Sequence, residues 1–373
     1  EMDEDFVTNA LARKERMFNA VDRLPIVIDM ILANNEEDRK VALERLMPFQ
    51  RDDFVQLFKT MAPNPVTVRL LDPPMHEFLP TEQDLLEQIG NLEVYRKIVR
   101  GRQTAIATLD HDVKLPEAFE EMDEDFVTNA LARKERMLRK VRELDEVNPM
   151  LGHRGVRLGI TYPEIYEMQI RAILEAAMQC AEDGVDVHPE IMVPQVITLQ
   201  EIIHVRRTAD KIVAKLESEH DKKLDFKFGT MIETVRACTR AWHLADVAEF
   251  FSFGTNDLTQ ATFSFSREDA ENKFLPMYNE VGVLQDNPFE VLDTKGVGKL
   301  MKMAVKGGRE QREDLKIGIC GEQGGHPESI QFCHDIGLNY VSCSGPRVPI
   351  ARLAAAQAKL RAARTTSTKL KAA

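Results

Sequence analysis

The sequence has no long apolar run, no closely spaced pair of cysteines and no extended basic segment. No stretch approaches the roughly eighteen uninterrupted apolar residues of a membrane span, and the acidic start EMDEDF is unlike a signal peptide. The five cysteines are an odd number without CxxC spacing, which argues against a zinc site and a secreted disulfide framework. These absences predict a soluble intracellular protein in a reducing compartment, without a membrane partner.

Positive charge is also in short supply. The 61 acidic residues outnumber the 49 lysines and arginines, which gives a formal net charge of −12. This balance argues against a nucleic-acid partner and against binding to an anionic membrane surface. At 373 residues, the chain is long enough for one barrel-sized domain or two ordinary ones.

One segment occurs twice. EMDEDFVTNALARKERM fills residues 1–17 and, letter for letter, residues 121–137, with different sequence after each copy. Diverged structural repeats keep only their core positions, so perfect identity indicates a recent duplication or an assembly join rather than a solenoid. The second copy continues into the amphipathic run RMLRKVRELDEV, which is typical of a helix. We therefore interpret the first copy as the foreign one.

Strand-like and helical segments alternate through most of the chain. Residues 18–62, with Asn34 and Asn35 as possible caps, and residues 81–146 are expected to be largely helical. Seven segments predict strands: 66–71, 151–158, 190–196, 226–233, 249–255, 315–320 and 339–344. The alternation favours an α/β fold with a parallel sheet, either a (β/α)8 TIM-type barrel that lacks its first strand or a doubly wound open sheet.

The stretch EFFSFGTNDLTQ, residues 249–260, carries the clearest sign of a site. An apolar run suited to a buried strand stops at Gly254, where a tight turn is expected to bring Thr255, Asn256 and Asp257 together. These types suit ligand binding, because asparagine donates and accepts hydrogen bonds, aspartate holds hard cations and glycine admits an anion close to the backbone. The alternative is an ordinary turn in which Asn256 and Asp257 cap the next helix.

Glu233 and Asp257 end consecutive predicted strands. In a barrel, chemistry collects at the carboxyl ends of the strands, so their carboxylates are expected side by side, an arrangement in which proteins usually hold Mg²⁺. The alternative is that each acid pairs separately with a lysine or arginine. Arg69, Arg154 and Arg267 would supply a positive face for a carboxylate or phosphate. A strand arginine such as Arg69 is also commonly a solvated edge residue or a salt-bridge partner.

Cys320 lies between Ile-Gly-Ile and Gly-Glu-Gln-Gly-Gly, at the end of a predicted strand. A buried free cysteine is usually an inert small hydrophobe. The flanking glycines open the backbone around this thiol, which makes Cys320 the candidate reactive group.

These segments together resemble a known family. NPMLGHRGVRLGITYPEIYEMQ, GTMIE, FFSFGTNDLTQATFSFSRED and GICGEQGGHPES are similar to the PEP/pyruvate-binding C-terminal barrel of the PEP-utilising enzymes, and VTVRLLDPPMHEFLP is similar to its pyruvate, phosphate dikinase branch. The motifs cover about residues 18–80 and 146–353. The implied organisation is a foreign segment at 1–17, a barrel at 18–353 with a helical insertion at about 81–146, and a helix end and tail at 354–373.

The resemblance implies a role for each matching residue. Glu233 and Asp257 correspond to the two Mg²⁺ ligands, and Gly254, Thr255, Asn256 and Asp257 form the substrate-binding turn. Cys320 corresponds to the acid/base that exchanges a proton with the methyl or methylene carbon of pyruvate and PEP.

Arginines complete the implied site. Arg69 corresponds to a residue that binds the phosphoryl group of PEP, and Arg267 is expected to assist it. Arg154 and Arg13 are weaker substrate-binding candidates. Arg13 stands in ARKERMF, where the family has a motif like CRTEHMF at the end of the first barrel strand.

The family interconverts pyruvate and PEP with a phosphoryl group from a phosphohistidine on a separate domain, and its full dikinase reaction converts ATP, pyruvate and phosphate to AMP, PEP and diphosphate. This chain has neither the Thr/Ser-Cys-His-Ala-Ala motif of that domain nor a nucleotide-binding region. We therefore expect a C-terminal portion that binds pyruvate or PEP and Mg²⁺, forms a homodimer as the family commonly does, and cannot use ATP alone.

Two other functions fit parts of this pattern. One is a barrel like that of PEP synthase or of enzyme I of the sugar phosphotransferase system, which share GTND and the cysteine strand. The other is a non-catalytic remnant kept for dimerisation. The expected compartment is the cytoplasm or a peroxisome- or glycosome-like organelle, because AKL at 358–360 resembles a peroxisomal address, although such a signal is read only at a free C-terminus.

Overall fold

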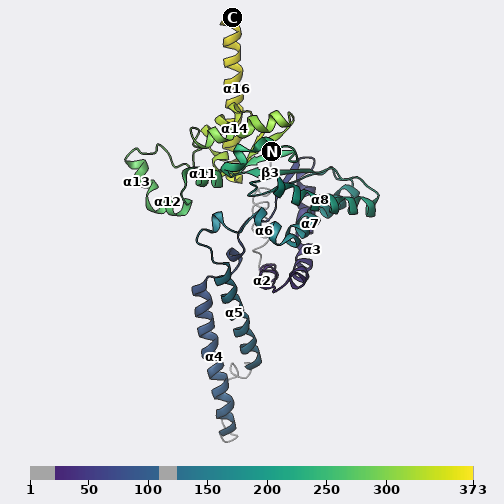
Figure 1. Ribbon diagram of the computed structural model, residues 1–373, viewed down its shortest axis with the longest axis vertical. Helices are drawn as coiled ribbons and strands as arrows, with labels where there is room; N and C mark the ends of the chain where they lie inside the picture. Colours follow the sequence, from purple (N-terminus) through teal and green to yellow (C-terminus); the bar gives the residue numbers. More distant parts are fainter. Residues whose placement is uncertain (1–21, 109–123, 373) are drawn as a thin grey trace. The chain divides into compact units, whose positions relative to one another are not determined.

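The structure, a computed structural model, describes residues 22–108 and 124–372 (Figure 1). Arg13, the first copy of the repeat and the expected place of a first strand lie outside the described residues, so those predictions stay predictions. The chain divides into two compact units. The first, called the sheet unit, contains Leu46–Asp72 and His153–Ala373, and the second, called the helical unit, contains Phe18–Arg45 and Pro73–Gly152.

A parallel six-stranded sheet forms the centre of the sheet unit. Its strands pair in the order β1-β2-β3-β4-β5-β6. The strands are β1 Pro65–Arg69, β2 His188–Val193, β3 Lys227–Ile232, β4 Phe250–Phe253, β5 Lys316–Ile319 and β6 Tyr340–Val341. Among the described residues β1 and β6 do not pair with each other, so the sheet is a half-barrel. The predicted α/β fold with a parallel sheet is confirmed, and this geometry is consistent with a partial TIM-type barrel.

The predicted strand at 151–158 is wrong. This segment forms the short turn η3 Pro149–Leu151 and the helix α6 Val156–Thr161. Gly155 lies between them at φ +58°, a conformation that favours glycine and turns the chain. Its N–H donates to the carbonyl of Asp72 at 3.1 Å, and the N–H of Val156 donates to that of Pro194 at 3.2 Å. The backbone N–H groups of this segment therefore bind the loops after β1 and β2 and do not pair with a neighbouring strand.

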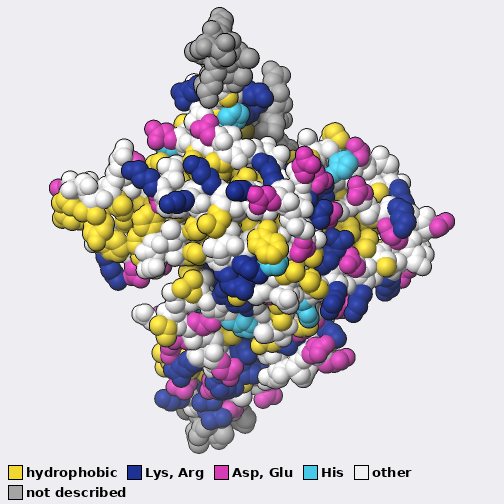
Figure 2. Space-filling view, turned by 45° about the horizontal axis from the view of Figure 1, so that its top comes forward, with side chains coloured by type: hydrophobic (Ala, Val, Ile, Leu, Met, Phe, Trp, Pro, Cys, Tyr) yellow, Lys and Arg dark blue, Asp and Glu magenta, His cyan; other side chains and the backbone are white. Residues whose placement is uncertain are grey.

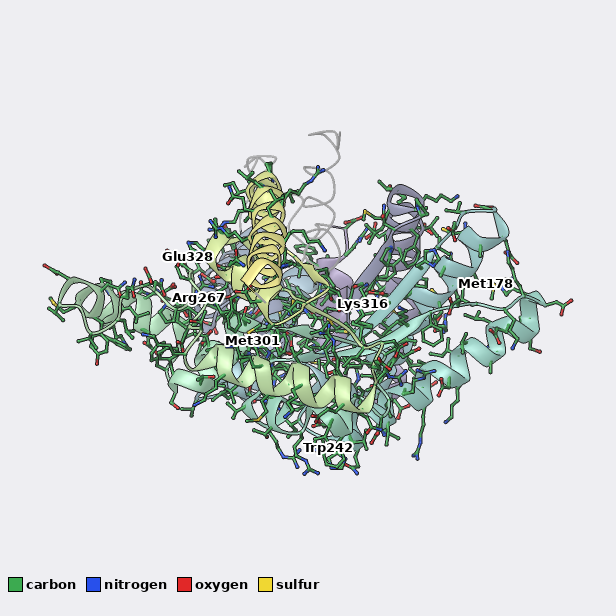
Figure 3. The ribbon with its side chains drawn as sticks, turned by 90° about the horizontal axis from the view of Figure 1, so that it is seen from above. Met178, Trp242, Arg267, Met301, Lys316 and Glu328 are labelled. Carbon is green, nitrogen blue, oxygen red and sulfur yellow. The ribbon has the colours of Figure 1, made fainter. Side chains whose placement is uncertain are left out.

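Helices connect the strands, and Figure 3 shows the helices and strands with their side chains. Helix α7 begins at Pro163, and α8 starts with a capping box between Thr198 and Glu201. The main crossover helices are α7 Pro163–Glu182, α8 Leu199–His220, α9 Val235–Thr239, α10 Ala241–Leu244, α11 Thr255–Phe263, α14 Val297–Gln311 and α15 Pro327–Asp335. The others are α3 Glu36–Met61, the short pair α12 Arg267–Lys273 and α13 Leu275–Glu280, and α16 Val348–Ala372. Helix α16 projects from the sheet unit as one long helix (Figure 1).

The two faces of the sheet differ in chemistry because side chains alternate along each strand. The outer face is apolar, and Phe251 on β4 packs so closely on α14 that a Cβ on Gly308 would lie 2.8 Å from its ring. The inner face carries polar groups. Glu190 of β2 and Lys316 of β5 form an ion pair across it, although two strands separate them in the sheet. Side chains of the inner face therefore converge.

The helical unit contains α2 Leu24–Leu32, the turn η1 Met75–Phe78 and the long pair α4 Glu82–Thr108 and α5 Glu124–Leu144. Helices α4 and α5 lie side by side (Figure 1). Their apolar contact is centred on Leu85, Met137 and Leu138. The predicted helical character of 18–62 and 81–146 is confirmed for the described residues, and the Asn35 side chain accepts a hydrogen bond from the N–H of Asp38 at the start of α3.

The surface carries charged side chains of both signs, as the sequence composition predicts. Figure 2 shows basic and acidic side chains interspersed over the face in view rather than separated by sign. Within the described ranges, the structure contains no helix with the length and apolar character needed to cross a membrane.

Candidate functional site

Charged side chains of the sheet unit gather where the strands end. Arg69 is the last residue of β1, and Glu233 follows β3 directly. Asp257 lies in the first turn of α11 after β4, and Cys320 follows β5. Arg154 comes from the loop before α6. The carboxyl ends of neighbouring parallel strands meet at one edge, so this arrangement agrees with the predicted place of the site.

Asp72, which the sequence reasoning missed, joins two of the predicted arginines. The Nη1 atom of Arg69 lies 3.1 Å from Asp72 Oδ2, and Arg154 binds the same carboxylate oxygen. Arg154 also reaches Asp257, with 3.2 Å between Nη1 and Oδ1. Asp72 is 2% exposed and Arg154 is 5% exposed, whereas the Arg69 side chain is 40% exposed, so the network extends from a buried carboxylate to the surface. The sequence signal for Asp72 was its position directly after the predicted strand at 66–71.

Glu233 is held by one oxygen only. Its Oε1 accepts a hydrogen bond from the backbone N–H of Gln195 at 2.6 Å, whereas its Oε2 has no hydrogen-bond partner among the described residues. Burial, followed by the charges of Asp257 and Asp72, raises the pKa of Glu233 to about 8. Burial also raises the pKa of Asp257, against the opposing effect of Arg154. The two acids therefore repel each other in a desolvated place.

This pair of acids fits a hard cation. Within the described part of the chain, no group of three or more His, Cys, Asp and Glu side chains is arranged to hold a metal. Mg²⁺ is commonly bound by one or two carboxylates together with waters and substrate oxygens, so a two-carboxylate site meets its needs. The unpartnered Oε2 of Glu233 is the observation that favours a cation, because an unsatisfied buried oxygen is costly.

The GTND segment is a helix start rather than a loop tip. Gly254 is the N-cap of α11, and Thr255, Asn256 and Asp257 form its first turn. The predicted tight turn after Gly254 is thus the first turn of a helix, and the alternative of side-chain capping by Asn256 and Asp257 is wrong, because the N-cap is a glycine without a side chain. Gly254 is needed for space: a Cβ there would lie 2.3 Å from Glu233 Oε2.

Thr255 and Asn256 tie α11 to the segment that follows Cys320, which forms the short helix η4 Glu322–Gly325. The Thr255 hydroxyl donates to Gln323 Oε1 at 2.7 Å, and Asn256 Oδ1 accepts from the N–H of Glu322 at 3.3 Å. These contacts fix the backbone beside the thiol. Their predicted contact with substrate stays a prediction.

Arg267 is tied to other acids. It makes a two-pronged ion pair with Glu322, at 2.6 and 3.0 Å, and its Nε lies 3.1 Å from Glu271. Its guanidinium also lies 5.3 Å from the ring centre of Phe289 (Figure 3 labels Arg267). Arg267 is thus linked to the site indirectly: it binds Glu322, whose backbone N–H donates to Asn256. Its predicted contact with a phosphoryl group stays a prediction.

The Cys320 thiol is half-buried on the inner face, against Met192, Met231 and Phe250. Burial raises its pKa to about 11, and the charge of Glu233 adds to this effect, whereas a hydrogen bond with Ser252 lowers the pKa. The thiol therefore keeps its proton at neutral pH.

Sequence reasoning also missed Ser252 and Tyr340. Burial raises the pKa of Tyr340 to about 12, and Ser252 lowers the pKa of both the Tyr340 hydroxyl and the Cys320 thiol. The Cys320 thiol itself donates to the carbonyl oxygen of Phe253 at 3.5 Å. The alternation of FFSF was an available signal, because it places Ser252 on the face opposite to the buried Phe251 and Phe253.

Comparison with known proteins gives consistent matches. A family model described as the PEP-binding domain of PEP-utilising enzymes matches residues 4–360. The chain is 52% identical over 352 residues to pyruvate, phosphate dikinase of Entamoeba histolytica, covering 94% of this chain and 36% of that protein. It is 47% identical over 353 residues to the Giardia intestinalis enzyme, covering 94% and 35%. It is 49% identical over 348 residues to the chloroplastic enzyme of Mesembryanthemum crystallinum, covering 93% and 33%. The chain thus spans about a third of the length of these relatives.

Proposed function

Since the chain belongs to the PEP-utilising enzyme family through its PEP-binding domain, we propose that it is the pyruvate- and PEP-binding part of a pyruvate, phosphate dikinase. The observation that carries the proposal is the grouping at the strand ends of two desolvated acids, Glu233 and Asp257, two arginines and the protonated thiol of Cys320. A three-carbon acid needs these three kinds of group for phosphoryl transfer and proton exchange.

Glu233 and Asp257 are proposed to hold Mg²⁺. The raised pKa values and the free Oε2 of Glu233 support this role, because a divalent cation would remove both the repulsion and the missing contact. When bound, the ion would supply positive charge for the oxygens of pyruvate and its enolate. Gly254 keeps the space beside Oε2 open.

Arg69 and Arg154 are proposed to bind the phosphoryl group and the carboxylate. Their shared partner Asp72 holds both guanidinium groups at the same end of the sheet. A planar guanidinium held in this way presents donors to an anion without first losing side-chain freedom. Arg267 and Arg13 remain secondary candidates, the first because Glu322 and Glu271 already bind it, the second because it lies outside the described residues.

Cys320 is proposed as the proton carrier. In the direction of pyruvate, the S–H bond breaks while a C–H bond forms at the terminal carbon of the enolate, and in the direction of PEP the thiolate takes that proton back. A pKa of about 11 keeps the thiol in the acid form, and the nearby Ser252 hydroxyl supports the thiolate when it forms.

The rest of the reaction lies beyond this chain. We propose that the phosphoryl group comes from a phosphohistidine domain, that the full enzyme converts ATP, pyruvate and phosphate to AMP, PEP and diphosphate, and that the half-barrel belongs to a closed (β/α)8 barrel within a homodimer. The helical segment at about 81–146 is proposed as an insertion in that barrel. An intracellular, reducing compartment, cytoplasmic or peroxisome-like, remains part of the proposal. The alternatives are a barrel of the PEP synthase or enzyme I type and a remnant that only dimerises.

Binding of oxalate, a mimic of the pyruvate enolate, tests the site. The chain should bind oxalate only with Mg²⁺ in isothermal titration calorimetry, and the double variant Glu233→Ala/Asp257→Ala should abolish this binding. Cys320→Ala should spare oxalate binding but stop solvent exchange of the pyruvate methyl protons, measured by NMR. Unchanged binding in the double variant would exclude the metal assignment. A cooperatively folded wild-type chain that binds no oxalate would favour the remnant.

A further inference from the structure

Gln195 is a buried polar residue that the proposed mechanism leaves unused. It lies just after β2 and is 2% exposed. Its backbone N–H donates to Glu233 Oε1 at 2.6 Å, which fixes this carboxylate and leaves Oε2 free. Gln195 therefore lies in contact with the proposed cation ligand.

The backbone at Gln195 has an unusual conformation. Its φ of +59° is uncommon for a residue other than glycine. It packs against Gly155, at φ +58°, so closely that a Cβ on Gly155 would lie 2.8 Å from both Cβ and Cγ of Gln195. Strained residues persist where the surroundings hold them, and they cluster at ligand sites. The fold thus holds the Gln195 side chain in one place.

The side-chain amide of Gln195 has an N–H donor without a hydrogen-bond partner among the described residues. Among the described residues, its Nε2 has no hydrogen-bond partner, and neither does Asp72 Oδ1. Both side chains flank Gly155, because its added Cβ would also lie 3.1 Å from Asp72 Oδ1. A buried amide next to an acid normally forms a hydrogen bond with it. Here the Gln195 Nε2 donor and the Asp72 Oδ1 acceptor both lack a partner among the described residues, so each can still form a hydrogen bond.

We propose that Gln195 Nε2 donates a hydrogen bond to an anionic oxygen of the bound three-carbon acid or its phosphoryl group. This inference rests on the proposed function and adds a residue that it does not contain. The ligand brings the acceptor that the amide lacks, at the end of the sheet where Asp72 holds Arg69 and Arg154. The competing occupant is a structural water, which would satisfy the amide without affecting ligand affinity.

Gln195→Met tests the inference, with Gln50→Met as a matched control. Gln50, on α3, is 0% exposed, and both its amide atoms are unpartnered among the described residues. Methionine has a similar shape and no polar hydrogen, so both variants should raise the Tm by roughly 2–4 °C. Only Gln195→Met should weaken oxalate binding in the presence of Mg²⁺, by about 10- to 100-fold.

Two further measurements separate a ligand contact from a structural role. The affinity for Mg²⁺ alone should not change in Gln195→Met, because the backbone N–H that holds Glu233 remains. Gln195→Gly, which tolerates a positive φ and keeps that N–H, should lose oxalate affinity to a similar extent. This second variant keeps the test valid if the first one folds poorly.

Three outcomes would overturn the inference. If the wild type binds oxalate and Gln195→Met binds it equally well, the amide holds only a structural water and the proposed function stands. If the Mg²⁺ affinity falls as much as the oxalate affinity, the residue acts on the cation site instead. If the wild type itself binds no oxalate, the proposed function and this inference fail together.

Discussion

Two groups of charged residues lie on the inner face of the half-barrel, and they differ in how fully they satisfy each other. Toward the amino ends of the strands, Lys316 Nζ donates to both oxygens of Glu190, at 2.7 and 2.9 Å, and the Thr67 hydroxyl donates to Oε2 at 2.6 Å. Figure 3 labels Lys316. At the carboxyl ends, Glu233 has a partner for one oxygen only.

The difference is that one charge group has its hydrogen bonds satisfied and the other does not. A buried ion pair offsets its desolvation only when good geometry satisfies the remaining donors and acceptors, and the Glu190 pair meets this condition. The site around Glu233 does not, since three carboxylates, Asp72, Glu233 and Asp257, face two guanidinium groups and two carboxylate oxygens stay unpartnered among the described residues. We infer that the Glu190 pair stabilises the fold and that the group around Glu233 binds a ligand.

Removing Lys316 should have the largest effect on stability. Lys316→Met leaves the Glu190 carboxylate buried without its cation, so the free energy of unfolding should fall by about 3–5 kcal/mol. Removing both charges in Lys316→Met/Glu190→Met should restore much of that loss, because no unpaired charge remains. Urea unfolding followed by circular dichroism measures both variants.

A surface pair provides the control for this prediction. Lys59 pairs with Asp183 at 2.7 Å, and both side chains are largely open to solvent. Lys59→Met should leave the urea midpoint nearly unchanged. If Lys316→Met also left the urea midpoint unchanged, the pair between Lys316 and Glu190 would not stabilise the fold.

The second prediction concerns pH and Glu233. The raised pKa of about 8 means that the folded protein keeps a proton that the unfolded chain releases near pH 4.3. This contribution to stability is therefore complete below about pH 4 and is lost as the pH rises to about 8, with a slope of at most about 1.4 kcal/mol per pH unit. Without metal, the free energy of unfolding should fall over this range more steeply in the wild type than in Glu233→Gln.

Subtracting the Glu233→Gln profile from the wild-type profile removes the titration of all other groups that do not interact with Glu233. Added Mg²⁺ should flatten the difference at pH 8, because the proposed cation binds the ionised form. A difference that does not depend on pH would mean that Glu233 is ionised in the folded chain and that its free oxygen is already satisfied.

The sequence was sufficient for most of the sheet and for the strand ends that carry the candidate site residues. KFGTMI and FFSF are short, mainly apolar runs with few alternatives to a buried strand, so β3 and β4, and with them the positions of Glu233 and Asp257, followed directly. The segment 151–158 failed because its conformation depends on Gly155 and on loops more than 35 residues distant, at Asp72 and Pro194.

The partners within the site were harder to predict. Asp72 reads as a turn residue, and only the fold brings it to Arg154, 82 residues away. Gln195 reads as part of an apolar strand, yet its role depends on Glu233, 38 residues away. The pairing of Arg267 with Glu322 spans 55 residues. Sequence patterns report periodicity and turn chemistry, whereas side-chain pairing across strands requires the tertiary arrangement.

Substituting Gly254 should cost less stability than removing Lys316 and still remove binding. A Cβ at this position would lie 2.3 Å from Glu233 Oε2 and 2.6 Å from Met231 Cε, so Gly254→Ala must displace buried side chains, at a cost of about 1–3 kcal/mol. Because the methyl group fills the space beside the free oxygen, Mg²⁺-dependent oxalate binding should be lost even where the protein remains folded.

Gly307→Ala is the matched control, since its Cβ would meet nothing closer than 3.6 Å, at Trp242. Gly307 lies inside α14, where alanine favours the helix, so this variant should be as stable as the wild type or more so and should bind oxalate normally. If Gly254→Ala bound oxalate as the control does, the space beside Oε2 would not be the ligand site, and the unpartnered oxygen at the strand ends would need another explanation.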